Sequence, residues 1–123
     1  RLDATEGMIA EATILVAERR NAQAFSCVEA GVRANPEDAA AWYQVGRCAV
    51  LSGEQVTQGI VALRRCLELG PTGGEGRPTR AAAHFRLGEL LERAGDLVEA
   101  QRERDLALRL QPDLRMEKVA LRL

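Results

Sequence analysis

The stretch from Ala39 to Pro71 constrains the fold of this chain more than any other part of the sequence. It contains two segments with apolar residues at helical spacing, which are joined at Ser52-Gly53 and ended by Gly70-Pro71. Gly46 lies in the middle of the first segment, where a glycine costs a helix about 1 kcal/mol relative to alanine. The close approach of a second helix would explain a glycine at this position. The stretch therefore predicts a helix hairpin, with a second helix from about Glu54 to Leu69.

The same pattern occurs in two further parts of the chain, one before and one after this hairpin. In the later copy, the places of Trp42, Val45, Gly46, Ala49 and Gly53 are taken by His84, Leu87, Gly88, Leu91 and Gly95. After the turn, Gly59, Cys66, Leu67, Leu69 and Pro71 correspond to Ala100, Ala107, Leu108, Leu110 and Pro112, with one extra residue in the central copy. The earlier copy fits less closely and has Arg19 where the others have glycine. Hairpins are therefore expected at about residues 5–36, 39–71 and 81–112.

Capping residues place the ends of the remaining helices. Asp3 or Thr5 is expected to cap a first helix that runs to about Glu18. A second helix is expected from about Ala22 to Ala34. The segment 35–38, Asn-Pro-Glu-Asp, ends this helix and suits the start of the next. The last hairpin is expected to begin near Pro78-Thr79.

Three copies in phase resemble the tetratricopeptide repeat family, which has a signature of about 34 residues. The central copy meets that signature at Trp42, Val45-Gly46, Gly59, Leu63, Cys66 and Pro71, and the last copy meets it at Leu87-Gly88, Ala100, Ala107 and Pro112. The departures are His84 at the tryptophan place, Ala49 and Leu91 at the tyrosine place, and Arg104 where the family prefers a large apolar residue. The resemblance implies an all-α fold in a single domain over residues 1–123. This fold would be a right-handed superhelical solenoid of about three helix hairpins with a C-terminal capping helix.

Two segments lie outside the repeated pattern. Residues 70–79 contain four glycines and two prolines, which predicts a loop insertion without helix. This loop is either a tolerated insertion or a flexible lip that contacts a partner. Residues 113–123 predict the capping helix, since the ends of a solenoid need a polar outer face. The chain starts at Arg1 without a methionine, which suggests a fragment or a processed protein.

The charge pattern and the cysteines exclude several classes of partner. The chain has 17 basic and 18 acidic residues, and their interspersion predicts no binding to nucleic acid. No apolar run of about 18 residues is present, so membrane insertion is not expected. The three cysteines show neither metal-ligand spacing nor a complete disulfide framework, which favours small packing residues and no metal. Free thiols favour a cytoplasmic location, although an exported form stays open.

The sequence offers no set of catalytic residues. The one histidine, His84, takes a packing position, and no other general base is present to activate Ser26 or Ser52. The glycine-rich loop lacks the Gly-Lys-Ser/Thr ending of a phosphate-binding loop. We therefore expect no enzyme activity and no cofactor.

The family resemblance implies that a concave groove, lined by the first helix of each hairpin, binds a partner. Carried over to this sequence, the groove residues are Ile9, Ala10, Thr13, Tyr43, Gln44, Arg47, Phe85, Arg86 and Glu89, with Val50 and Leu51 one turn later. Ile9, Tyr43 and Phe85 would form an apolar stripe of exposed side chains. Gln44, Arg47 and Arg86 would form a polar edge that can hold a carboxylate or backbone carbonyls. The alternative is that the stripe only packs between neighbouring helices.

Some members of the family bind the terminal carboxylate of chaperones with a set of lysines and asparagines. Gln44 and Arg86 resemble part of that set, but Ile9, Thr13 and Ala82 stand where its other polar residues should be. The resemblance therefore does not support recognition of a chaperone tail.

The first hypothesis for function is a protein–protein interaction scaffold that binds a peptide segment of a partner protein in the groove. In this hypothesis, Tyr43 and Phe85 are apolar anchors and Arg47 and Arg86 are charge partners. A second hypothesis is a regulatory or assembly segment of a larger enzyme or of a secretion or envelope complex. A third is a homo-oligomer formed through the end helices, since open ends of a solenoid can stack.

Overall fold

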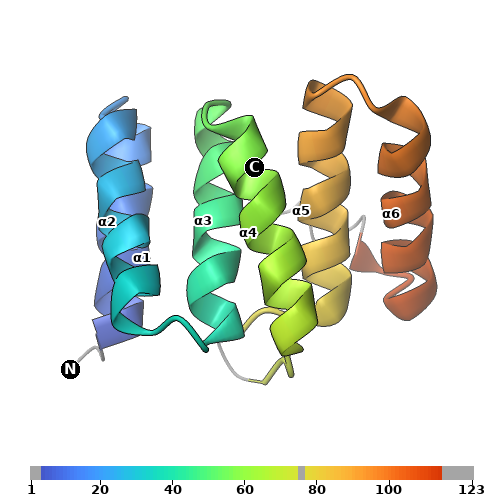
Figure 1. The fold of residues 1–123 in the computed structure, drawn as a ribbon, viewed down its shortest axis with the longest axis horizontal. Coiled ribbons are helices and arrows are strands. Elements are labelled where there is room, and N and C mark those ends of the chain that lie inside the picture. Colours follow the sequence, from blue (N-terminus) through green and yellow to red (C-terminus); the bar gives the residue numbers. More distant parts are fainter. Residues whose placement is uncertain (1–3, 75–76, 115–123) are drawn as a thin grey trace.

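The computed structural model describes residues 4–74 and 77–114, and these residues form six α-helices and no strand (Figure 1). The helices are α1 (Ala4–Ala17), α2 (Asn21–Ala34), α3 (Ala39–Ser52), α4 (Val56–Leu69), α5 (Arg80–Arg93) and α6 (Leu97–Leu110). Consecutive helices pair as α1–α2, α3–α4 and α5–α6, and the pairs stand side by side in the order of the sequence. This arrangement is the all-α solenoid that the repeats predict.

Local capping chemistry sets most of the helix ends. Asp38 begins α3, because its side chain accepts a hydrogen bond from the backbone N–H of Ala40 at 3.0 Å. Thr79 caps α5 in the same way, through the N–H of Ala82 at 3.0 Å. Gly53 and Gly70 end α3 and α4 in the left-handed conformation, with φ of 74° and 83°. These capping residues and glycines therefore determine where α3, α4 and α5 begin or end.

Two helix starts differ from the expectation. Helix α4 begins at Val56 and not near Glu54, because Gln55 adopts a positive φ of 57° before the helix. Helix α1 begins at Ala4, so Thr5 lies inside the helix and is not its cap, and Asp3 is outside the described residues. At the first turn, Arg19 adopts a φ of 61°, which is the conformation that Gly53 and Gly95 adopt in the other hairpins.

Glycines mark the places where helices approach most closely. A Cβ atom at Gly46 would lie 2.3 Å from Cγ of Leu63, which is fully buried on α4. The expected close approach within the central hairpin is therefore confirmed. A Cβ atom at Gly59 would lie 2.6 Å from Cβ of Ala49 on α3 and 2.7 Å from Cδ1 of Leu90 on α5. Gly59 thus allows α4 to pack closely against α3 of its own hairpin and α5 of the next.

One hydrophobic core runs through the stacked hairpins, from Ala12 on α1 to Ala100 on α6. Cys48 and Cys66 are buried, Cys27 is partly buried, and all three are free thiols. These positions confirm that Cys48 and Cys66 are small packing residues. A second, smaller cluster joins Ala81, Ala107 and Leu114.

The two segments outside the repeat differ in how much of them is described. The described residues of the 70–79 loop contain no helix, and the N–H of Gly73 donates to the carbonyl of Pro78 at 3.1 Å. Arg77 ties the loop to the start of α3 through an ion pair with Asp38 at 3.6 Å. The expected helix at 113–123 lies outside the described residues apart from Asp113 and Leu114. Within the described part of the chain, no helix is long and apolar enough to cross a membrane.

Candidate functional site

The first helices of the three hairpins carry a row of polar side chains that connects them. Helix α3 contacts both α1 and α5. On one side, Nη1 of Arg47 donates to Oγ1 of Thr13 at 3.1 Å, and this hydroxyl donates to the carbonyl of Ile9 at 2.7 Å. On the other side, Nε of Arg86 donates to the hydroxyl of Tyr43 at 3.3 Å. The row therefore spans three helices that are distant in sequence. We call Thr13, Tyr43, Arg47, Arg86 and Glu89 the polar row.

Two arginines dominate the electrostatics of the polar row. The pKa of Arg47 is lowered, first by burial and then by the positive charge of Arg86. Arginine side chains in proteins carry a positive charge at neutral pH. Arg86 has an acidic neighbour, since its Nη1 lies 3.7 Å from Oε1 of Glu89. Within the described residues, Arg47 has no carboxylate within 4.0 Å and is held by the neutral Thr13 hydroxyl. The row thus contains more positive than negative charge.

The expected stripe of exposed apolar side chains does not form around Tyr43. Tyr43 is only 8% exposed and belongs to the core, and its helix, α3, contacts the first helices of both neighbouring hairpins. Phe85 is partly buried and packs against the smaller cluster of Ala81, Ala107 and Leu114. Ile9 is partly buried on α1. The expectation of an exposed Tyr43 is wrong, and its hydroxyl instead holds Arg86.

The remaining predicted groove residues divide into buried and partly buried positions. Gln44 and Val50 are buried, each 6% exposed, so both offer little surface to a partner. Leu51 is exposed, and Thr13, Arg47, Arg86 and Glu89 are partly buried. The structure therefore brings Thr13, Arg47, Arg86 and Glu89 together and buries Gln44 and part of the apolar set.

His84 takes the packing position that the sequence predicts and is 9% exposed. The sequence analysis did not foresee its partner, because Nδ1 of His84 lies 2.5 Å from Oε2 of Glu103 on α6. In the alignment of the repeats, Glu103 takes the place of Ala62. The sequence contained a signal for this contact, since the last hairpin has two polar residues, His84 and Glu103, where the central hairpin has the apolar pair Trp42 and Ala62.

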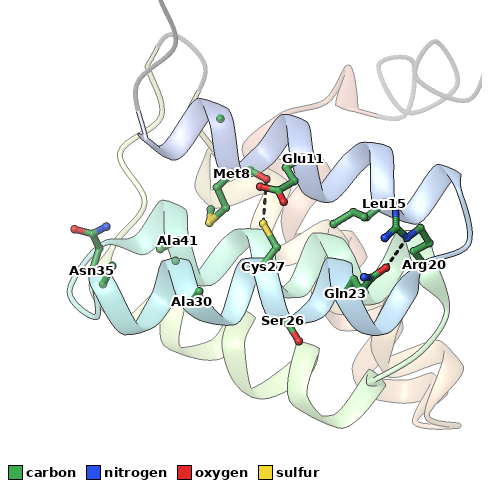
Figure 2. A pocket seen from close by; sticks show the side chains of 13 residues that line it. Met8, Glu11, Leu15, Arg20, Gln23, Ser26, Cys27, Ala30, Asn35 and Ala41 are labelled. Atoms are coloured by element: carbon green, nitrogen blue, oxygen red, sulfur yellow. Dashed lines mark hydrogen bonds between the residues drawn. The ribbon is translucent and has the colours of Figure 1, made fainter.

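A separate hollow of about 920 Å³ lies along α1 and α2 at one end of the solenoid (Figure 2). Small residues form much of its lining, including Gly7, Ala30, Gly31 and Ala34. In Figure 2 the thiol of Cys27 points at α1, where it donates to the carbonyl of Met8 at 3.8 Å. The pKa of this thiol is raised, first by burial and then by the charge of Glu11. A protonated thiol is a poor nucleophile, so the hollow lacks an activated cysteine.

The described residues contain no group of three or more His, Cys, Asp or Glu side chains that could hold a metal ion. The features available for recognition are therefore surfaces, charges and recesses.

Comparison with known proteins identifies the family. Residues 9–73 match the sequence profile of the tetratricopeptide repeat. The chain belongs to the tetratricopeptide repeat family. The matched region covers most of the first two hairpins, and the third hairpin repeats their pattern of glycines and buried residues. No curated protein matches the chain.

A tetratricopeptide repeat solenoid of this shape also occurs among solved structures. One similar structure is that of MamA, from residue 41 to its end, from Desulfovibrio magneticus RS-1, with a TM-score of 0.69 and 23% sequence identity. The similarity covers 90% of this chain and 58% of the MamA chain, and it shows a shared fold. Repeats of this family generally serve protein–protein interaction, and proteins with this fold are typically non-enzymatic.

Proposed function

We propose that the chain binds an acidic peptide segment of a partner protein on the face formed by α1, α3 and α5. Arg47 and Arg86 would hold a carboxylate of that segment. The observation that supports this proposal is the pairing of Arg47 with a neutral hydroxyl close to a second arginine, without a carboxylate of its own among the described residues. A ligand carboxylate would supply the missing negative charge.

Because Arg47 and Arg86 are partly buried, their positive charges attract a ligand carboxylate more strongly than the same charges would at an open surface. Two like charges near each other are unfavourable, and a partly buried site screens them less than bulk water does. A carboxylate between the two guanidinium groups would relieve that repulsion and accept charge-assisted hydrogen bonds. Electrostatic complementarity of this kind chiefly sets specificity and the association rate.

Neighbouring side chains hold both arginines in place before a ligand arrives. Thr13 positions Arg47, and the buried Tyr43 positions Arg86 through its hydroxyl. Side chains that are already ordered lose less entropy on binding, which favours affinity. Phe85 and Ile9, both partly buried, would supply apolar contact at the two ends of the row.

The test uses two synthetic peptides of twelve residues, one with alternating glutamate and alanine and one with glutamine in place of glutamate. Binding is measured by fluorescence anisotropy of an attached dye. We expect the glutamate peptide to bind at least tenfold more tightly, with an affinity that falls as salt rises. Arg47→Gln and Arg86→Gln should each remove most of this preference. Arg64→Gln is the matched control, because Arg64 is exposed on α4, away from the polar row. Equal binding of both peptides to the unaltered protein would reject the proposal.

Self-association through the end of the solenoid is a second candidate function. The hollow along α1 and α2 is lined by small residues that allow a helix to approach closely. Exposed apolar residues on α6, namely Leu97, Val98 and Leu110, lie on the last hairpin. A second copy could bring these surfaces together head to tail.

Sedimentation velocity over a concentration series tests this candidate. We expect Ala30→Arg, which fills the hollow, to shift the protein toward the monomer. Ala22→Arg is the control, since Ala22 is exposed on the same helix outside the hollow. A monomer at all concentrations for the unaltered protein would reject self-association.

A further inference from the structure

A recess on the second helices forms a surface that is separate from the polar row. It is lined by residues of α2, α3 and α4, which stand in this order from left to right in Figure 1, and has a volume of about 300 Å³. Phe25, Trp42, Val45 and Ala62 form its apolar floor. Glu29 and Arg33 on α2 and Val61 on α4 form its rim. We call this recess the α2–α4 slot.

The floor of the slot is apolar and well fixed. Phe25, Val45 and Ala62 are buried in the core. Trp42 is partly buried, and its Nε1 donates to the carbonyl of Pro36 at 2.8 Å. The one polar atom of the indole is therefore engaged, and the rest of the ring is available as apolar surface.

The size of the slot follows from the pairing of Trp42 with a small residue. In the alignment of the repeats, the places of Trp42 and Ala62 are taken in the last hairpin by His84 and Glu103. Those two side chains bond directly to each other. Alanine at position 62 has only a methyl group, so the central hairpin leaves space above the indole. A volume of this size is at the lower end of ligand-binding clefts and suits one or two apolar side chains.

The rim of the slot carries one acid and one base whose spacing is fixed by α2. Glu29 and Arg33 are four residues apart, which corresponds to about 6 Å along a helix. Within the described part of the chain, neither side chain forms an ion pair or a side-chain hydrogen bond. Val61, on the other side of the slot, is 59% exposed. The slot thus combines an apolar floor with two charged side chains of opposite sign, Glu29 and Arg33, that have no ion-pair partner among the described residues.

We propose that the α2–α4 slot binds an amphipathic helix of a partner protein. One leucine or aromatic side chain of that helix would enter the slot between Trp42 and Val61. One basic and one acidic residue of the helix, four positions apart, would meet Glu29 and Arg33. Residues four positions apart on one face of a helix lie about 6 Å apart, as Glu29 and Arg33 do, and this matching spacing is the argument for a helix.

Trp42 is the single tryptophan of the chain and lines the slot, so its fluorescence reports occupancy directly. The probes are two capped, alanine-rich peptides without tryptophan that carry a central leucine flanked by lysine and glutamate four residues apart. The two peptides have the charges in opposite order, because the helix can lie in either direction along α2. We expect one of the two orders to produce a saturable change in Trp42 emission.

Variants of the protein then locate the binding site. Val61→Lys should weaken binding at least tenfold, and Glu29→Gln and Arg33→Gln should each weaken it severalfold. Val98→Lys is the matched control, since Val98 on α6 is 67% exposed, similar to the 59% of Val61. Val98→Lys should leave binding unchanged. Circular dichroism checks that each variant keeps its helical content.

Three results would overturn the proposal. The first is the absence of a saturable change in Trp42 emission with both peptides. The second is an equal affinity of the Val61→Lys and Val98→Lys variants, which would place the peptide elsewhere. The third is a change in Trp42 emission with protein concentration alone, which would show that a second copy of the chain occupies the slot.

Discussion

Nδ1 of His84 lies 2.5 Å from Oε2 of Glu103, and this contact joins α5 to α6 inside the last hairpin. Both side chains are largely buried, with 11% and 16% of their surface exposed. Glu103→Gln should therefore lower the free energy of unfolding by about 1–3 kcal/mol, because the largely buried His84 loses its carboxylate partner. Urea denaturation followed by circular dichroism measures this change.

The control for this prediction is Glu68→Gln on α4. Glu68 is exposed and its carboxylate lies 3.6 Å from Arg65. An exposed pair of this kind contributes little, so we expect a change within about 0.5 kcal/mol. Equal effects of the two substitutions would contradict the structural role of Glu103.

Gly46→Ala should destabilise the protein, even though alanine favours a helix. The added Cβ atom would lie 2.3 Å from Cγ of the fully buried Leu63. Overpacking of a core costs about 1–3 kcal/mol, which exceeds the gain in helix propensity of about 1 kcal/mol. Gly7→Ala in α1 is the control, because a Cβ atom there would meet nothing within 4 Å. That control should raise the midpoint of thermal unfolding, and a rise for both variants would argue against close packing at Gly46.

Arg19→Gly should stabilise the protein. Arg19 adopts a φ of 61° at the turn between α1 and α2, a conformation that glycine adopts without a steric penalty. The left-handed conformation costs a residue with a Cβ atom about 1–2 kcal/mol, and part of this cost should be recovered. Gly95→Ala makes the reverse change at the equivalent turn, where φ is 90° and a Cβ atom would meet nothing within 4 Å. Opposite shifts in the urea midpoint are expected for the two variants, and shifts of the same sign would contradict this explanation.

The stability of the fold should decrease in alkaline solution because of two buried thiols. Burial raises the pKa of Cys48 and Cys66 from 9.0 to about 11 in the folded chain. In the unfolded chain, these thiols ionise at a lower pH and release their protons first. Their contribution is therefore complete below about pH 9 and is lost between about pH 9 and pH 11. Urea midpoints at pH 8 and pH 10 measure the loss, and a variant with alanine at both positions should show a smaller one. The same loss in that variant would assign it to other groups.

The sequence predicted the helix ends and the contacts that depend on single residues. Gly53, Gly70 and Thr79 have short-range effects on the backbone, and the structure follows them closely. At the start of α3 the cap is Asp38, the last residue of the Asn-Pro-Glu-Asp segment, and not its first residue, Asn35. The tight packing of Gly46 was predictable for the same reason, since a glycine inside a helix needs a neighbour to explain it. Gln55 was missed because a positive φ at a residue other than glycine has no clear sequence signal.

The candidate site was harder to predict, because burial in a solenoid depends on neighbouring hairpins. Tyr43 is buried, and its helix, α3, contacts both α1 and α5 of the neighbouring hairpins. Arg104 was seen only as a departure from the family pattern. In the structure, its Cγ atom lies 3.0 Å from where a Cβ atom at Gly88 would be, and its guanidinium group pairs with Glu92 at 2.6 Å. Arg104 thus covers the glycine with its aliphatic part, as Leu63 does in the central hairpin.

The α2–α4 slot could not be predicted, since it depends on the size of Ala62 beneath residues of two other helices. No pattern within one repeat shows that relationship.

Helix α3 contributes to both proposed surfaces, with Arg47 on one side and Trp42 on the other, five residues along the same rigid element. A ligand that displaces α3 as it binds to one surface would alter the geometry of the other surface. Such a coupling is reciprocal. If an acidic peptide at the polar row lowers the affinity of the α2–α4 slot for a partner helix by some factor, the bound helix lowers the affinity for the peptide by the same factor. Through α3, the binding of one partner would then change the affinity for the other, although the two partners do not contact each other.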